Sequence, residues 1–262
     1  YESKTLGKNR YTFYNNVFEQ KLLKDIKLEQ DILEGLKNNE FKIYIQPKVN
    51  PKTNKIEGGE ALVRWITKDK IIYPDEFIPF CEKSDLIVHL GDVVLAQVLD
   101  LFKKWNQKEH FSTLSLSFNL SSKQIKNEAL LDIFNSHKVY LNSKAFLIVE
   151  STEHSIVEDF AKMKDFLEVL RELNIKVAID DFGTGYSSLQ SLKNLPIDYL
   201  KIDKGFTLNL FNDEKDMAIS KTIINLADNL NLHTIIEGVE TQEHVNFAIE
   251  HNCTYAQGYF YS

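Results

Sequence analysis

Two adjacent carboxylates follow a predicted buried strand in the second half of the chain. Residues 179–188 read IDDFGTGYSS and come directly after the apolar run IKVA, so Asp180 and Asp181 stand at the end of that strand. Two neighbouring anions at the edge of a core repel each other unless a positive group lies between them. The pattern therefore predicts a counter-charge close to this pair.

Oxygen-rich polar groups end most of the other predicted strands as well. In chain order these residues are Glu60, Asn119, Glu150, the pair Asp180 and Asp181, Lys201 with Asp203, Glu237 and Gln257. One such residue alone is most simply explained as a solvated strand end. Seven strands that carry these groups at one rim, most of them Glu or Asp, indicate a shared site.

Divalent cations would solve the electrostatic problem of such a site. Mg²⁺ and Mn²⁺ prefer carboxylate, amide and water oxygens, and the absence of His and Cys from this set disfavours zinc. Adjacent aspartates can hold two ions about 3.5–4 Å apart, the arrangement used for phosphoryl displacement. The set predicts metal-dependent phosphoryl or enolate chemistry, in which Lys201 could polarise a water or offset negative charge.

Two neighbouring features bear on a phosphorylated ligand. Arg64 lies four residues beyond Glu60, on the same strand face, where it can contact a phosphate. The stretch GTGYSSL predicts a loop that opens a helix, with Ser187 or Ser188 near its N-cap. Such a loop can cradle a phosphate, but a simple tight turn explains its glycines equally well, and both interpretations stay open.

The elements that must position these residues alternate between strands and helices. Strands are predicted at 41–49, 57–65, 113–121, 145–152, 175–181, 198–203, 233–240 and 255–260. The clearest helical patterns cover 86–106, 155–174 and 214–231. Eight strands that alternate with helices in a chain of 262 residues predict an α/β fold, a closed (β/α)8 TIM-type barrel whose active site lies at the carboxyl ends of the strands.

The composition of the chain indicates which partners and which cellular compartment to expect. The net charge of −7 argues against a DNA or RNA polymer, and no apolar run approaches the length that spans a membrane, so we expect no membrane contact from this segment. Cys81 and Cys253 are far apart and form no disulfide framework or zinc ribbon. A domain in the cytoplasm fits this cysteine usage.

The ordered motifs along the chain resemble one known family, the EAL domains, bacterial phosphodiesterases that hydrolyse cyclic di-GMP. These motifs are EALVRW at 60–65, QP at 46–47, FIP at 77–79, FNLS at 118–121, VESTE at 149–153, DDFGTGYSSL at 180–189, LKID at 200–203, EGVET at 237–241 and QGYF at 257–260. The match runs from about residue 30 to the end. The stretch 66–77 departs from it, because the usual His-Pro and Gly of that connection are missing.

The resemblance implies a barrel whose first strand runs antiparallel to the others, and a site with two Mg²⁺ or Mn²⁺ ions. It implies the metal ligands Glu60, Asn119, Glu150, Asp180, Asp181 and Glu237, with Asp180 bridging both ions. It implies that Lys201, Glu237 and Glu60 are catalytic, and that Glu237 is either close to the second ion or the general base. Substrate-binding residues would be Gln46, Arg64, Asp203 and Gln257, and Glu153 would hold the DDFGTGYSS loop.

The activity that the resemblance implies is hydrolysis of one phosphodiester of cyclic di-GMP to linear pGpG, by a two-metal mechanism with an activated water. It also implies a homodimer.

Residues 3–14 resemble the last strand of a GGDEF domain. We therefore expect 1–20 to be a remnant of a preceding GGDEF-like domain in a GGDEF–EAL protein, 21–40 to be a lead-in helix and linker, and 41–262 to be the barrel.

Three alternative functions remain at this stage. A catalytically silent receptor could bind cyclic di-GMP and signal through its conformation, although such proteins usually lose metal ligands. A protein-interaction module would bind no nucleotide. An enolase-like metal site is compatible with the carboxylates, but the Asp180–Asp181 pair and the lack of a His/Lys base pair weigh against it.

Overall fold

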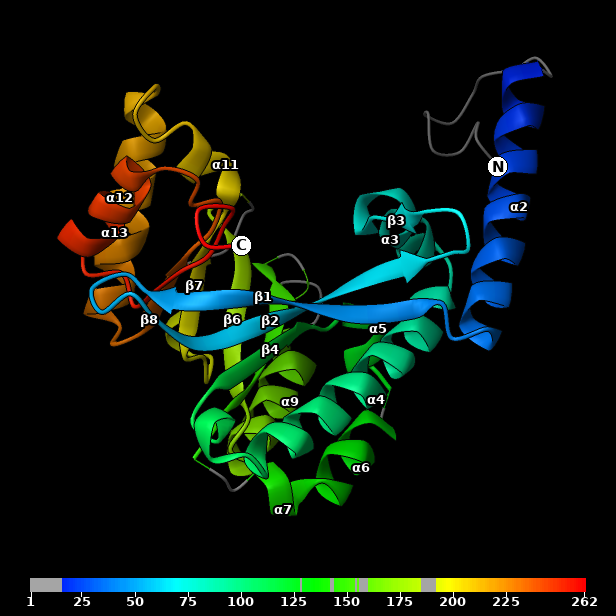
Figure 1. The fold of residues 1–262 in the computed structure, drawn as a ribbon, viewed down its shortest axis with the longest axis horizontal. Coiled ribbons are helices and arrows are strands. Elements are labelled where there is room, and N and C mark those ends of the chain that lie inside the picture. The colour runs from blue at the N-terminus through cyan, green and yellow to red at the C-terminus, as the bar shows by residue number, and fades with distance from the viewer. Residues whose placement is uncertain (1–15, 128, 142–143, 154, 156–159, 185–191) are drawn as a thin grey trace.

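A computed structural model describes residues 16–262 except 128, 142–143, 154, 156–159 and 185–191 (Figure 1). The segment 3–14 with the GGDEF-like pattern, and Ser187 and Ser188 of the predicted N-cap, lie outside the described residues. Among the described helices, none is both long and apolar enough to cross a membrane.

Eight strands close into a barrel, as the sequence predicts. They are β1 (Phe41–Asn50), β2 (Lys55–Ile66), β4 (Ser115–Asn119), β5 (Leu147–Thr152), β6 (Lys176–Phe182), β7 (Tyr199–Ile202), β8 (His233–Ile236) and β9 (Tyr255–Ala256). β1 pairs antiparallel with both β2 and β9, which closes the ring, and the other neighbours in the ring pair in parallel. The α/β TIM-type barrel with an antiparallel first strand is confirmed.

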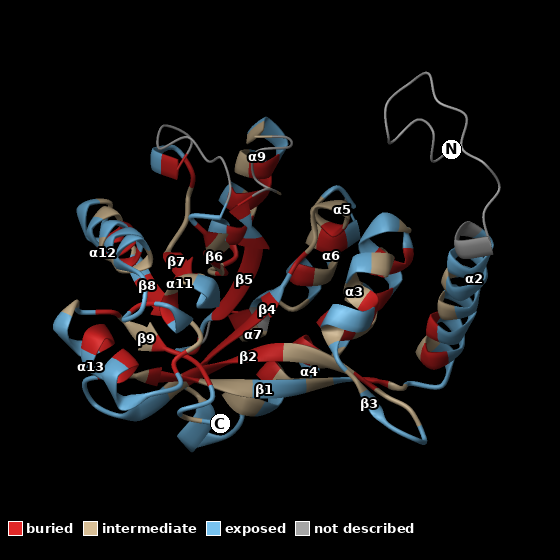
Figure 2. Ribbon diagram, turned by 90° about the horizontal axis from the view of Figure 1, so that it is seen from above, coloured by how far each residue is buried: buried red, intermediate tan, exposed pale blue. Residues whose placement is uncertain are grey.

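The helices lie outside the barrel (Figure 1). Their bounds are α2 (Asn16–Lys37), α3 (Pro74–Lys83), α4 (Leu86–Asn106), η1 (Glu109–Phe111), α5 (Ser122–Ile125), α6 (Ala129–Ser136), α7 (Lys138–Leu141), α9 (Phe160–Glu172), α11 (Lys204–Leu208), α12 (Glu214–Asn229) and α13 (Gln242–Glu250). Of these, α3, α4, α9, α12 and α13 pack on the strands of the barrel. Helix α4 matches its predicted range of 86–106, because its apolar positions recur at helical spacing. Figure 2 shows buried residues concentrated in the central strands and exposed residues on the outer helix faces.

Asparagine ends four of these helices. Asn39, Asn174, Asn231 and Asn252 each lie two residues beyond a helix and have positive φ angles of 54° to 59°. Asparagine tolerates this left-handed conformation better than most residues, so it turns the chain from each helix toward the next strand.

A short strand that the sequence did not predict extends the sheet. β3 (Ile71–Ile72) pairs antiparallel with the end of β2, where Trp65 is opposite Ile72. The hydroxyl of Thr67 accepts the backbone N–H of Lys70, which tightens the turn between the strands. Two residues are too few to produce a periodic pattern, so the stretch 66–77 reads as a simple connection.

The interior of the barrel is layered with a period of two residues. Ile148, Ala178, Tyr199 and Ile235 form a separate apolar cluster on β5 to β8, with Tyr255 of β9 packed against it. Two residues further along each chain segment come Glu150, Asp180, Lys201, Glu237 and Gln257. Because side chains alternate along a strand, an apolar floor lies directly beneath the polar mouth.

Helix α2 contacts the barrel through its C-terminal half. Ile32 is completely buried, and Gly35 lies against the indole of Trp65 and the ring of Phe41. The indole N–H of Trp65 donates to Glu40 at 2.9 Å. By contrast, Leu23 in the first half of the helix is 60% exposed.

We predict that Ile32→Ala lowers the free energy of unfolding by roughly 2–4 kcal/mol, because it leaves a cavity between α2 and the barrel. The matched control Leu23→Ala, on the same helix but exposed, should change it by less than about 0.5 kcal/mol. Urea denaturation of both variants measures the difference. Equal effects would mean that α2 does not pack on the barrel as described.

Candidate active site and metal centre

The positive group that the aspartates require is the side chain of Lys201. Lys201 is almost fully buried on β7, and its ammonium group ion-pairs with four carboxylates. The distances from Nζ are 2.8 Å to Glu237, 3.0 Å to Asp180 and 3.4 Å to Glu60, and Glu150 is in still closer contact. One lysine therefore joins acidic groups from β2, β5, β6 and the end of β8.

Two amide side chains hold Glu60 in place. Asn119 Nδ2 donates to one oxygen of Glu60 at 2.8 Å, and Gln257 Nε2 donates to the other at 2.7 Å. Gln257 Nε2 also donates to Gln46 at 2.8 Å, and Gln46 is directly opposite Glu60 in the β1–β2 pair. The predicted residues Gln46, Glu60, Asn119 and Gln257 thus form one hydrogen-bonded group.

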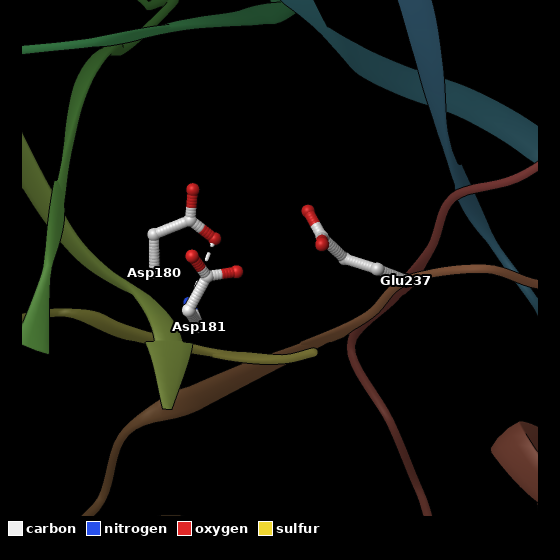
Figure 3. Close-up of side chains that lie close together, drawn as sticks. All are labelled: Asp180, Asp181 and Glu237. Atoms are coloured by element: carbon white, nitrogen blue, oxygen red, sulfur yellow. Dashed lines mark hydrogen bonds between the residues drawn. The ribbon is translucent and has the colours of Figure 1, made fainter. Parts of the chain in front are cut away.

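Three carboxylates converge closely enough to share a cation. One oxygen from each of Asp180, Asp181 and Glu237 lies within 4.8 Å of the others. Figure 3 shows the two aspartates side by side, with Glu237 reaching toward them from the other side. Hard divalent cations fit these donors, because all three are carboxylates and none is a softer ligand.

The two aspartates share this space because the strand is irregular between them. Adjacent residues of a regular strand point to opposite faces. Here the pairing of β6 with β7 shifts between Ile179 and Phe182, and Asp181 adopts a left-handed φ of 52°. The backbone N–H of Asp181 donates to Asp180 at 3.0 Å, so the bulge turns Asp181 toward its neighbour.

Burial and mutual repulsion raise the pKa values of two of these groups. Burial, together with the charges of Asp180 and Glu60, raises the pKa of Glu237 to about 8, although Lys201 opposes the shift. Burial and the neighbouring Asp180 and Asp203 raise the pKa of Asp181 to about 6. The pKa of Glu60 is also raised, chiefly by burial and then by Glu150.

Glu150 behaves in the opposite way. Its burial alone would raise the pKa, but the ammonium groups of Lys201 and Lys48 outweigh burial and lower the pKa to about 2. Burial would likewise lower the pKa of Lys201, yet Glu150, Glu237, Glu60 and Asp180 raise it well above its ordinary value. The site therefore combines an ionised Glu150–Lys201 pair with acids whose pKa values are raised.

The contacts described for the other predicted site residues lie outside the Lys201 cluster. Arg64 has its guanidinium 5.4 Å from the ring centroid of Tyr73, and it donates to the backbone carbonyl of Val63 at 2.9 Å. Asp203 caps α11 by accepting the N–H of Gly205 at 2.8 Å. Glu153 accepts the N–H of Gly183 at 3.1 Å, at the start of the Gly-Thr-Gly segment.

One residue of the site, Lys48, is not among those predicted from the sequence. It is fully buried on β1 and reaches Ser117 and Glu150. The signal was its spacing: Lys48 is two residues from Gln46 and so shares its strand face.

The eight-stranded barrel and its carboxylate-lined mouth define an α/β-barrel protein with a candidate centre for divalent cations. The chain belongs to the EAL domain family, whose family model matches residues 29–262.

Relatives with curated names agree with this assignment. The chain is 34% identical over 261 residues to the bifunctional diguanylate cyclase/cyclic di-GMP phosphodiesterase MucR of Pseudomonas aeruginosa, which covers 99% of the chain and 38% of MucR. It is 30% identical to the cyclic di-GMP phosphodiesterase NbdA of the same species, over 100% of the chain and 34% of NbdA. The chain thus spans between a third and two fifths of the length of these two relatives.

Solved structures show the same barrel. A complex of the MucR phosphodiesterase with c-di-GMP aligns with a TM-score of 0.84 at 34% identity, covering 90% of this chain and 96% of that one. An EAL domain protein from Listeria monocytogenes aligns with a TM-score of 0.73 at 31% identity, covering 89% and 92%.

We predict that, in the presence of a chelator, the free energy of unfolding falls as pH rises from about 5 to about 8. The folded chain holds protons on Glu237 (ordinary pKa 4.5, raised to about 8) and Asp181 (3.8, raised to about 6) that the unfolded chain has lost. Where the folded state binds more protons than the unfolded state, stability decreases with pH.

Denaturant titrations across this range, on the wild type and on Glu237→Gln, measure the effect. The variant removes the contribution of Glu237, so its stability should decline less steeply with pH. Parallel pH profiles for the two proteins would show that Glu237 titrates normally.

Proposed function

We propose that this chain hydrolyses one 3′–5′ phosphodiester bond of cyclic di-GMP to linear pGpG, with two Mg²⁺ or Mn²⁺ ions. The observation that carries the proposal is the convergence of Asp180, Asp181 and Glu237 beside the Lys201-centred carboxylates. Membership of the EAL family and the names of the relatives MucR and NbdA support the choice of substrate.

Two groups of residues would hold the cations. Glu60, Asn119, Glu150 and Asp180 would bind the first, and Asp180, Asp181 and Glu237 the second, so that Asp180 is shared. When bound, the two cations would supply the positive charge that favours ionisation of a water and stabilises the attacking and leaving oxygens of an in-line displacement.

The chain's own residues would orient the reactants and move the proton. Lys201 stays an ammonium, because the surrounding carboxylates raise its pKa, so it can donate to a water or to a developing negative oxygen. The pKa of Glu237 is raised to about 8, chiefly by burial. In its ionised form this carboxylate would act as the general base, because a pKa close to the working pH lets it take up a proton and release it again.

The substrate would lie over the amide group at the other side of Glu60. Gln257 is buried, and its Oε1 has no hydrogen-bond partner among the described residues. A buried acceptor without a partner is costly, so an N–H or O–H of a ligand would stabilise it. Gln46 is bonded to the same amide, and Arg64 would contact a phosphate from further along β2.

Asp203 and Glu153 are proposed to act on the edge of the site. Asp203 is committed to the cap of α11, and its charge also contributes to the raised pKa of Asp181, after burial and the charge of Asp180; we propose that it binds substrate from there. The hydrogen bond from Gly183 to Glu153 would hold the loop that follows the metal-binding aspartates.

The oligomeric state and the neighbouring domain of the chain are also proposals. We propose that the domain forms a homodimer in the cytoplasm, and that residues 3–14 are the end of a GGDEF-like domain in a longer protein. Analytical ultracentrifugation of the chain tests the dimer, and a monomer at all concentrations would contradict it.

The test of the activity is incubation of the chain with cyclic di-GMP and Mg²⁺ or Mn²⁺, followed by chromatography for pGpG. We expect pGpG to accumulate and a chelator to stop its formation. Binding of cyclic di-GMP in calorimetry without any product would instead identify a silent receptor. Neither binding nor product would favour a protein-interaction module.

We further predict that Asp180→Asn and Glu60→Gln each lower turnover by at least about a hundredfold, because each removes a carboxylate aimed at the reacting centre. The fold should be retained, since both substitutions keep the side-chain size. Asp132→Asn, an exposed aspartate on α6, is the matched control and should retain full activity. Normal turnover in either site variant would contradict the proposed ligand set.

A further inference from the structure

Lys48 is a second buried lysine at the site, and nothing in the proposed reaction uses it. Its side chain has no exposed surface. A buried ammonium group is costly unless it is paired and hydrogen-bonded. The partners of Lys48 Nζ are Ser117 Oγ at 2.7 Å and Glu150 Oε1 at 3.3 Å.

The strand register explains why Lys48 can reach the interior. Lys48 is opposite Gly58 in the β1–β2 pair, and Ser117 lies two strands along on β4. Gly58 and Ser117 are small, whereas the apolar floor on β5 to β8 contains the larger side chains of Ile148, Tyr199 and Ile235. The β1 side of the barrel therefore has room for a long side chain beneath the mouth.

Each of the two lysines contacts a different oxygen of the Glu150 carboxylate. Lys48 contacts Oε1, and Lys201 contacts Oε2. Lys201 also pairs with Glu60, Asp180 and Glu237, whereas the ion pair described for Lys48 goes to Glu150. Lys48 therefore acts on the site through Glu150, and it directs the other oxygen of Glu150 toward the centre.

The positive charge of Lys48 sets the net charge of the site when cations and substrate are bound. When cations are bound and all five carboxylates (Glu60, Glu150, Asp180, Asp181 and Glu237) are ionised, they and the two lysines (Lys48 and Lys201) carry a net charge of −3. Two divalent cations and the single phosphodiester group that reacts bring this net charge to zero. With Lys201 as the sole lysine, the same assembly would stay negative, which favours cations and disfavours an anionic substrate.

We propose that Lys48 is a positioning residue of the metal centre: a fixed cation that holds Oε1 of Glu150 and weakens the binding of divalent cations in favour of the anionic substrate. This inference rests on the proposed function, because it assumes that the carboxylates bind cations. Cation occupancy of this chain would then be set partly by a residue of β1 outside the ligand set.

The test is the affinity for Mn²⁺, measured on the metal-free full chain by the electron paramagnetic resonance signal of free Mn²⁺. Lys48→Met removes the charge and keeps the length of the side chain. Lys48→Gln removes the charge and keeps a hydrogen-bond donor, and it serves if the Met variant fails to fold. The matched control is Lys55→Met, an exposed lysine on β2.

We expect Mn²⁺ to bind at least about tenfold more tightly to both Lys48 variants, because a buried positive charge near the ions has been removed. The KM for cyclic di-GMP should rise by a similar factor at saturating Mn²⁺, and Lys55→Met should match the wild type in both measurements. Unchanged Mn²⁺ affinity would mean that Lys48 merely fills space, and weaker affinity would mean that it is needed to shape the site; either result overturns the inference. A wild type that binds no Mn²⁺ would overturn the proposed function as well.

Discussion

The structure depends on one electrostatic constraint: several carboxylates share the mouth of a barrel and must be neutralised there. Lys201 meets this constraint in the protein itself, since its ammonium group touches acidic side chains from four parts of the ring. The compensation is partial, because Glu237 and Asp181 keep raised pKa values, chiefly through burial. This remaining imbalance is what makes the site suited to divalent cations.

The barrel supplies the geometry that this constraint needs. On β5 to β9 an apolar residue is followed two positions later by a site residue, so the floor and the mouth are successive layers of the same strands. The antiparallel β1 breaks the pattern and brings Gln46 and Lys48 into the ring from the opposite chain direction. Lys48 consequently donates to Glu150 from a strand that does not end at the mouth, and Gln46 on the same strand accepts from Gln257.

Much of this arrangement could be predicted from the sequence, because periodicity and strand ends are local signals. The eight strands, the range of α4 and the convergence of Glu60, Asn119, Glu150 and the aspartates all follow from alternation and the barrel rule. Lys48 was missed since its partner Glu150 lies 102 residues away and the pairing needs the closed ring. The left-handed φ of Asp181 was missed because a bulge leaves no mark on hydrophobic periodicity.

A crystal structure with Mn²⁺, in which anomalous scattering locates the ions, tests the central claim most directly. We expect two Mn²⁺ sites that share Asp180. Asp181 and Glu237 complete one of them, and Glu60, Asn119 and Glu150 complete the other. Crystals in which Mn²⁺ binds elsewhere, or nowhere, while Lys201 and Lys48 remain the counter-ions of the carboxylates, would contradict this claim.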